Sequence, residues 1–229
     1  MTKVDLASAF LIHRRAFKES SLLLDFFTLD HGKIRLVGRS LRKSKTSIQS
    51  FQQLKISYSG RGDLKGLNSW EVDDVPRRLQ GDSLIFGMYV NELISRLLQE
   101  QDPHDELFVM YKDFISQLTE IDPASHHWLL RLFENNLLQE LGYGVDLSYD
   151  IIGNEINTEL MYEYQHQGGF IASVTGKISG DLISQLLADD IKNMPNLQQL
   201  RACRDLNRQR LKSLLGDKPL QSRSLFFSK

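Results

Sequence analysis

The apolar residues of this chain change their spacing once, near residue 80. Before that point they alternate with polar residues in short runs, such as Lys33–Leu36 and Leu54–Tyr58, as in strands with one solvent-facing side. From Asp82 onward they recur every three to four positions, which is the period of an amphipathic helix. The change predicts an α+β protein with a β domain over residues 1–80 and a mainly helical domain over residues 81–229.

The first eighty residues have room for about five strands and contain no helix of convincing length. Turn sequences at residues 30–32 and 60–63 separate several of these strands, and Gly32 is free to adopt a positive φ. Strands this short and this closely spaced favour a small closed barrel, of which the five-stranded OB-fold is the commonest nucleic-acid-binding example. An SH3-like barrel would produce nearly the same pattern, so the residues alone leave both open.

The second domain contains four predicted helices. Asp82 is the expected N-cap of the first, and Pro103 opens the next. Pro123 opens a third helix, which is expected to end at Gly142. The last helix covers about residues 196–215.

The formal net charge of −1 hides a strong segregation of charge. Residues 1–80 carry 15 Lys and Arg against 8 Asp and Glu, whereas residues 81–200 carry 5 against 19. Residues 201–229 return to a basic balance of 8 against 2. A basic first domain is suited to binding polyanions, which the acidic middle would repel. Chance segregation of solvated charge is the alternative.

The basic residues of the first domain gather on one predicted strand and the loop after it. Lys33 and Arg35 alternate with apolar residues, which predicts that both lie on the solvent face of that strand. The loop over residues 38–50 is polar and basic, and such a loop can follow a phosphate backbone. The predicted nucleic-acid-binding residues are Lys33, Arg35, Arg39, Arg42, Lys43, Lys45 and Arg61. A solvated surface loop is the alternative interpretation.

The predicted third helix places Arg131 among bulky apolar residues. In a helix, Trp128, Glu134 and Leu138 lie beside it. This arrangement could hold the carboxylate of a peptide tail above an apolar pocket. Alternatively, Arg131 forms an intrahelical ion pair with Glu134 and packs its stem on Leu138. The residues by themselves favour the ion pair.

Catalytic, metal-binding and membrane-spanning chemistry lack their usual signatures. The chain has no phosphate-binding GxxxxGKS/T loop, GxSxG elbow or HExxH motif. Its single cysteine, Cys203, excludes an internal disulfide and a thiolate zinc cluster. No apolar run approaches the ~18 residues that a bilayer span needs, and the N-terminus lacks a signal-peptide core. We therefore expect a cytoplasmic protein that uses no cofactor, and its residues nominate no nucleophile or general base.

Six short segments carry a family resemblance. They are Leu22–Thr28, Gly32–Val37, Tyr89–Leu93, Arg131–Glu134, Leu141–Gly144 and Lys218–Arg223. In this order, and with the basic loop after the second, they resemble the RecO family of bacterial recombination-mediator proteins. No single segment is diagnostic, but their ordered sum is, and the resemblance runs along nearly the whole chain.

The resemblance implies an N-terminal OB-fold on a helical C-terminal domain. It also implies a nucleoid-associated protein that binds single- and double-stranded DNA and anneals complementary strands. Family members work with RecR to load the RecA recombinase onto DNA coated by single-strand-binding protein, SSB. The family's DNA-binding residues correspond to the strand and loop around Lys33, Arg35, Arg39, Arg42 and Lys43.

Some members of the family bind the acidic C-terminal tail of SSB on the helical domain. By the Arg-x-Phe-Glu match, the arginine of that site corresponds to Arg131, so the resemblance reverses the preference for a plain ion pair. The implied tail-binding residues are Arg131, Trp128 and Leu138.

One region departs from the family pattern. Many members carry a four-cysteine zinc module between the middle helices and the last one, but residues 148–176 contain no cysteine. We predict a zinc-free hairpin here, with its first strand at Met161–Tyr164. Packing around Tyr162, Tyr164 and Phe170 is expected to hold it.

Two functions of other classes remain open. One is a non-catalytic adaptor whose small barrel binds peptides and whose basic loop is solvated surface. The other is a metal-dependent nuclease that uses the acidic middle of the chain. Loss of oligonucleotide binding on reversing Arg39 and Arg42 would favour the mediator over the adaptor, and DNA cleavage that requires Mg²⁺ would favour the nuclease.

Overall fold

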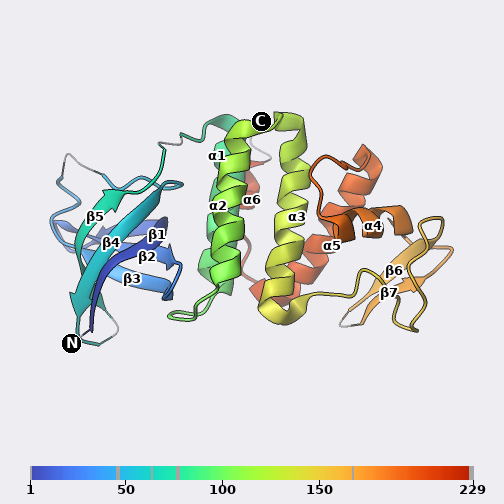
Figure 1. The fold of residues 1–229 in the computed structure, drawn as a ribbon, viewed down its shortest axis with the longest axis horizontal. Helices are drawn as coiled ribbons and strands as arrows, with labels where there is room; N and C mark the ends of the chain where they lie inside the picture. Colours follow the sequence, from blue (N-terminus) through green and yellow to red (C-terminus); the bar gives the residue numbers. More distant parts are fainter. Residues whose placement is uncertain (1, 45–46, 63, 76–77, 167, 227–229) are drawn as a thin grey trace. The chain divides into compact units, whose positions relative to one another are not determined.

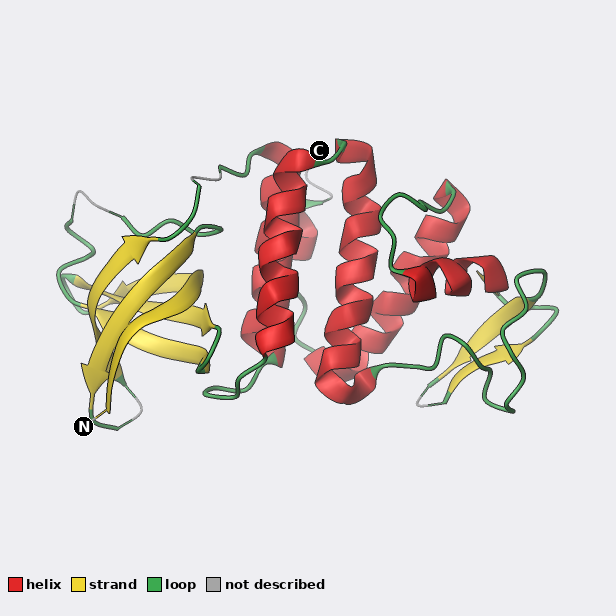
Figure 2. Cartoon of the chain, viewed as in Figure 1, coloured by secondary structure: helices red, strands yellow, loops and turns green. Residues whose placement is uncertain are grey.

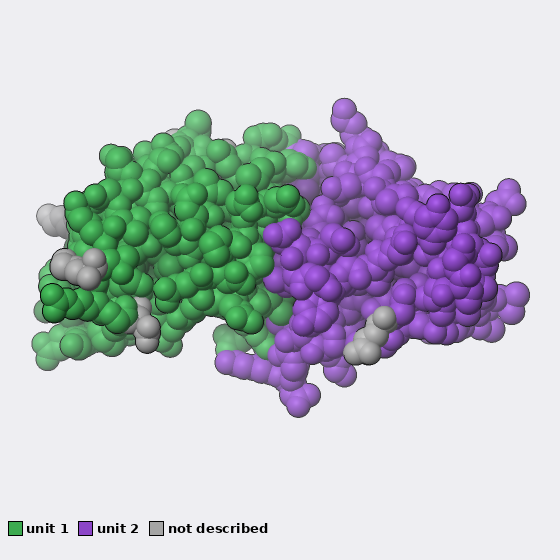
Figure 3. Space-filling view, turned by 60° about the horizontal axis from the view of Figure 1, so that its bottom comes forward, with its two compact units in different colours: residues 1–120, 220–229 green, residues 121–219 purple. Residues whose placement is uncertain are grey.

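The chain forms two compact units, which Figure 3 colours separately. The computed structural model describes residues 2–44, 47–62, 64–75, 78–166 and 168–226. The first unit comprises residues 1–120 and 220–229, and the second comprises residues 121–219. The last residues of the chain therefore belong with the first unit.

A closed five-stranded barrel occupies the first unit (Figures 1 and 2). Its strands are β1 (Thr2–Phe17), β2 (Ser21–Thr28), β3 (Gly32–Gly38), β4 (Gln53–Gly60) and β5 (Lys65–Val72). Their order is β1-β2-β3-β5-β4, and pairing of β1 with β4 closes the barrel. The β3–β5 pairing is parallel. This order confirms the predicted OB-fold.

Apolar side chains from alternate positions of the strands fill the barrel, as predicted. Phe26, Ile34, Leu36 and Ile56 are buried in one apolar cluster inside it, because side chains two positions apart share a face of a strand. Gly32 takes a φ of +62° at the β2–β3 turn, which is the conformation that glycine adopts without steric cost.

Helices α1 (Gly81–Leu97) and α2 (Asp105–Glu120) pack with the barrel in this unit. The ring of Phe10 in β1 lies 5.3 Å from Phe108 and 4.9 Å from Tyr111 in α2, measured between centroids. The prediction of Asp82 as N-cap is wrong: Gln80 precedes α1, and Asp82 lies in the first turn, where a carboxylate faces the positive end of the helix dipole.

The C-terminal helix α6 (Ser222–Leu225) is held in the first unit by Glu92 of α1. The Glu92 carboxylate accepts hydrogen bonds from the backbone N–H of Gln221 (2.9 Å) and of Ser222 (2.9 Å) and from the Ser222 hydroxyl (2.6 Å). Burial favours a higher pKa for Glu92, but these hydrogen bonds outweigh it and lower the pKa.

The second unit combines helices with a small sheet. Its elements are α3 (His126–Leu138), β6 (Met161–Gln165), β7 (Gly169–Ala172), β8 (Ile178–Ser179), α4 (Gly180–Ala188) and α5 (Leu197–Leu215). A 3₁₀ turn at Pro123–Ser125 precedes α3, and a π-helical turn at Gln139–Tyr143 follows it. Gly142 takes a φ of +78° there, so the chain leaves the helix where predicted. Helix α4 was not predicted.

The hairpin of β6 and β7 is held by the aromatic residues expected to hold it. Tyr162 and Phe170 are buried, and the rings of Tyr164 and Phe170 lie 6.0 Å apart. The Tyr162 hydroxyl accepts a hydrogen bond from the backbone N–H of Asn157 at 2.8 Å. Within the described ranges, no group of three or more His, Cys, Asp or Glu residues is placed to hold a metal ion.

Candidate nucleic-acid interface

Lys33 is buried, which makes the prediction of a solvent-facing position wrong for this residue. Its ammonium donates to the carbonyl oxygens of Ser95 (2.6 Å) and Leu98 (2.5 Å) at the C-terminal end of α1. The backbone after α1 runs beside β3, where the N–H of Gln101 donates to the Lys33 carbonyl at 2.9 Å. Burial lowers the pKa of Lys33, although Glu100 and Asp25 oppose that shift. Lys33 thus satisfies helix carbonyls that would otherwise lack a partner.

Arg35 is half-buried and already paired with two carboxylates. Its Nε lies 2.6 Å from Asp25 Oδ1, and its Nη1 lies 3.3 Å from Glu100 Oε1. The hydrogen bond to Asp25 raises the pKa of Arg35. The two cations of β3 therefore join the barrel to the segment that follows α1.

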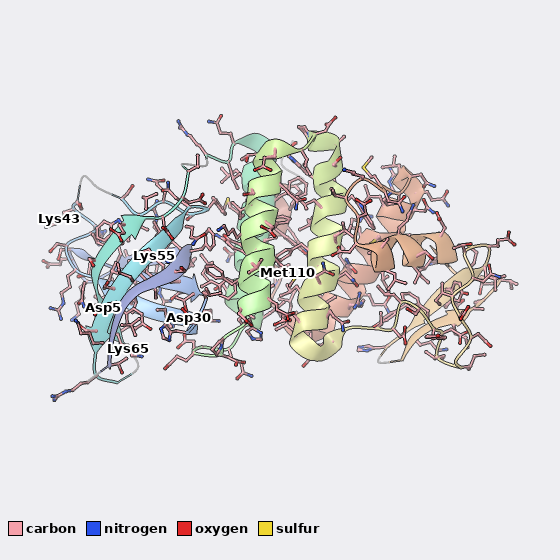
Figure 4. All side chains as sticks on the ribbon, viewed as in Figure 1. Asp5, Asp30, Lys43, Lys55, Lys65 and Met110 are labelled. Atoms are coloured by element: carbon pink, nitrogen blue, oxygen red, sulfur yellow. The ribbon has the colours of Figure 1, made fainter. Side chains whose placement is uncertain are left out.

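The loop after β3 carries cations of a different kind. Arg39, Arg42 and Lys43 are exposed, as is Arg61 in the turn after β4. Figure 4 labels Lys43 on this loop. The loop is tied to the β1–β2 turn, because Arg42 donates from its backbone N–H to Ser20 (3.0 Å) and from Nη1 to the Lys18 carbonyl (3.2 Å). Lys45 lies outside the described residues.

Two hollows flank the β1–β2 turn. The first, of about 470 Å³, is lined by the cations Lys18, Arg39 and Lys65 and by the ring of Phe17. The second, of about 360 Å³, is lined by Arg14, Arg15 and Arg42 above an apolar floor that includes Leu24 and Ile48. The first hollow lies between the β1–β2 turn and the start of β5, the region of an OB barrel that binds oligonucleotides.

Sequence reasoning missed four of these cations: Arg14, Arg15, Lys18 and Lys65. Three of them follow the apolar run at residues 9–12, which indicates the first strand, but β1 continues to Phe17. Its pairing with β4 ends at Phe10, whereas its pairing with β2 continues to Phe17. The end of β1 thus pairs with β2 but no longer with β4, and the adjacent Arg14 and Arg15 before a turn were the available signal.

In the second unit, Arg131 forms the intrahelical ion pair that the residues alone favoured. Its Nη1 lies 3.0 Å from Glu134 Oε2, and both side chains are buried. Trp128 and Leu138 have no accessible surface. The Trp128 indole N–H donates to the Asp190 carbonyl at 3.1 Å. Of the three residues expected to bind a tail, only Leu138 lines a described hollow.

That hollow, of about 320 Å³, opens over a second buried arginine, Arg210 of α5. Arg210 donates from Nη1 to Asn135 Oδ1 (3.0 Å) and from Nη2 to the Tyr143 carbonyl (3.3 Å). Its Nε has no hydrogen-bond partner in the described part of the chain. Burial lowers the pKa of Arg210, against the effect of nearby groups such as Tyr164.

The buried cluster is linked through Asn207, whose side-chain amide donates to Glu134 Oε2 and to the Arg131 carbonyl, each at 3.1 Å. Among the described residues, the buried carboxylate that Arg131 and Arg210 share in this cluster is Glu134. A buried charge is costly without a counter-charge, so Arg210 places an excess cation beside the adjoining hollow, whose lining also includes Asp146.

Comparison with known proteins identifies the family of the chain. A family model described as "Recombination protein O N terminal" matches residues 1–75, and one described as "Recombination protein O C terminal" matches residues 78–223. The chain belongs to the RecO family.

RecO proteins from several bacteria are similar along the whole chain. The "DNA repair protein RecO" of Psychromonas ingrahamii is 40% identical, with 99% of each chain covered. Its counterpart from Erwinia tasmaniensis is 40% identical over 95% of this chain and 91% of that protein. The protein from Pseudoalteromonas translucida is 36% identical, with 97% of each covered. RecO membership gives this chain a role in DNA repair and recombination.

The RecO family models meet between residues 75 and 78, whereas the compact units divide after residue 120. The difference comes from α1 and α2, which belong to the C-terminal sequence family but pack with the barrel. No helix among the described residues is long and apolar enough to cross a membrane.

Proposed function

We propose that this RecO-family chain is a DNA-annealing recombination mediator. It binds single- and double-stranded DNA, anneals complementary strands, and acts with RecR and SSB to load RecA on SSB-coated DNA. The observation that carries the proposal is the gathering of exposed cations around two hollows at the rim of an OB barrel. Guanidinium and ammonium groups there neutralise phosphates and release bound counterions.

Annealing in this proposal is a binding process in which no covalent bond is made or broken. The protein must neutralise two phosphate chains while leaving the base edges free to pair, so the contacts favour phosphates over bases. The chain is accordingly proposed to be a non-enzyme.

The proposed contact residues are those on the exposed loops of the barrel. Arg39, Arg42, Lys43 and Arg61 are exposed, and Lys45 is proposed with them from its place in the sequence. Lys33 and Arg35 are proposed to hold β3 against the end of α1 and the segment after it, rather than to contact DNA.

The acidic tail of SSB is proposed to dock on the second unit at the hollow over Arg210. The buried excess of positive charge at Arg210 supports a carboxylate ligand there, against the opposing charge of Asp146 in the lining of the same hollow. Leu138 contributes to the apolar wall. Arg131 and Trp128 support the site from beneath, since Arg131 holds Glu134 and Trp128 fixes α3 on the Asp190 segment. Docking on SSB would bring the barrel to coated DNA at high effective concentration.

The direct test of the mediator proposal is annealing of complementary oligonucleotides coated with the cognate SSB. The wild-type chain should accelerate annealing, and the double variant Arg39→Glu/Arg42→Glu should lose most of that acceleration. The matched control is Lys177→Glu/Lys192→Glu, which makes the same change of charge at exposed lysines of the second unit. Equal loss in both variants, or no acceleration by the wild type, would favour the peptide-binding adaptor instead.

Tail docking is tested separately with a synthetic SSB-tail peptide. His166 is exposed at the rim of the Arg210 hollow, so His166→Asp should weaken peptide binding through repulsion of its carboxylates while leaving oligonucleotide affinity unchanged. Lys177→Asp serves as the control. Peptide affinity that is the same in His166→Asp and the control would contradict the proposed site.

A further inference from the structure

These two hollows in the described part of the barrel are separate sites that share one wall. They have no lining residue in common. The wall consists of the β1–β2 turn and the start of the loop after β3, joined by the bonds from Arg42 to Ser20 and Lys18. Lys18 and Ser40, one in each segment of the wall, adopt positive φ values of 51° and 61°. These hydrogen bonds hold both segments in place between the hollows.

Each hollow presents three cations, and the sets do not overlap. Lys18, Arg39 and Lys65 line one, and Arg14, Arg15 and Arg42 line the other. Among the described residues, neither hollow is lined by an aspartate or a glutamate, and Glu19 in the turn lines neither. Two concave surfaces with the same charge, on opposite sides of a wall, suit two polyanions better than one.

Both hollows also contain apolar surface that suits nucleotides. Phe17 offers a ring on which a base can stack, and the Lys18 ammonium lies 5.5 Å from the centroid of that ring. The second hollow has an aliphatic floor of Leu22, Leu24, Leu41 and Ile48, against which a sugar or base face can pack. Arginine at its rim can bind phosphate oxygens in a bidentate manner.

We propose that the barrel holds two DNA strands at once, one in each hollow, with the wall between them. The inference rests on the proposed annealing function and gives it a mechanism. Two complementary strands then lie on either side of the wall, bound to the same protein molecule. Their pairing becomes an intramolecular step at high effective concentration. A duplex then forms at the edge of the wall, and pairing removes its bases from the two hollows.

The test is the number of short oligonucleotides bound per chain, measured by native mass spectrometry with non-complementary strands of about 6 nucleotides. The wild type should bind two at saturation. Arg14→Glu/Arg15→Glu and Lys18→Glu/Lys65→Glu should each bind one, retain single-stranded DNA binding, and lose annealing by about tenfold or more. These residues are at the surface of the first unit, and unfolding curves check that the variants fold.

Saturation of the wild type at one strand per chain would overturn the proposal, as would two strands per chain in either double variant. A third result would also overturn the proposal. If the wild type binds one strand together with an acidic peptide, and Arg14→Glu/Arg15→Glu abolishes binding of the peptide, the second hollow is a peptide site. Failure of the proposed function is a different result, since the wild type would then bind no oligonucleotide.

Discussion

Arginines lie in opposite environments at the barrel rim and in the core of the second unit. Arg39 and Arg42 lie in water on an exposed loop, where a bound phosphate costs them little desolvation. Arg131 and Arg210 are buried beside one carboxylate, where their charges are part of the packing. The comparison teaches that exposure separates the cations available to DNA from the buried cations that hold the fold. Ligand-binding cations should respond to salt, and buried ones should control stability.

The largest expected effect comes from breaking the buried cluster. Glu134→Gln leaves Arg131 and Arg210 buried without a counter-charge and should destabilise the protein by about 3–5 kcal/mol. Urea unfolding measures it, with Glu159→Gln as an exposed control on the same unit. An unfolding midpoint of Glu134→Gln equal to that of the control would show that the cluster does not stabilise the fold.

Lys33 tests the comparison between exposed and buried cations, because it lies on the barrel but is buried like Arg131 and Arg210. Lys33→Met removes its hydrogen bonds to Ser95 and Leu98 and should cost about 1–3 kcal/mol of stability. Amide exchange in the last turn of α1 should become faster. Oligonucleotide affinity, measured by fluorescence anisotropy, should stay within about twofold of wild type. If Lys33→Met has the stability of the wild type but no longer binds DNA, Lys33 is a DNA-binding residue and not a structural one.

Substitution of Glu92 is expected to have the smallest effect on stability, and that effect should depend on pH. Its pKa is lowered in the folded protein from an ordinary value of 4.5, so its contribution to stability is present above pH 4.5 and is lost as pH falls through the folded pKa. Glu92→Gln should cost about 1 kcal/mol at pH 7, and less at pH 3.5. A stability difference from wild type that is equal at both pH values would contradict this linkage.

Much of the fold follows from local patterns, but the roles of the charges do not. Alternation placed Ile34 and Leu36 inside the barrel, and the 3.6-residue period located α1, α2, α3 and α5. The same alternation put Lys33 on a solvent face, because the helix end that covers it is more than 60 residues away in the sequence. No local pattern carries that contact.

The candidate sites were predictable to a similar degree. The polarity of the loop after β3 pointed to Arg39, Arg42 and Lys43, which are exposed. Arg14 and Arg15 were missed because the strand that carries them extends past its apolar run, over a length that depends on pairing with β2. Arg210 was missed because its burial depends on packing of α5 against α3, which the helical period does not specify.

The most direct test of the division between exposed and buried cations is the salt dependence of single-stranded DNA binding. For the wild type and three variants, the logarithm of affinity is plotted against the logarithm of salt concentration. The slope should become shallower by about 0.7 per lost phosphate contact, or about 1.4 in Arg39→Glu/Arg42→Glu. It should be unchanged in Lys177→Glu/Lys192→Glu and, under conditions where it is folded, in Glu134→Gln. A wild-type slope retained by Arg39→Glu/Arg42→Glu would contradict the assignment of the barrel rim to DNA.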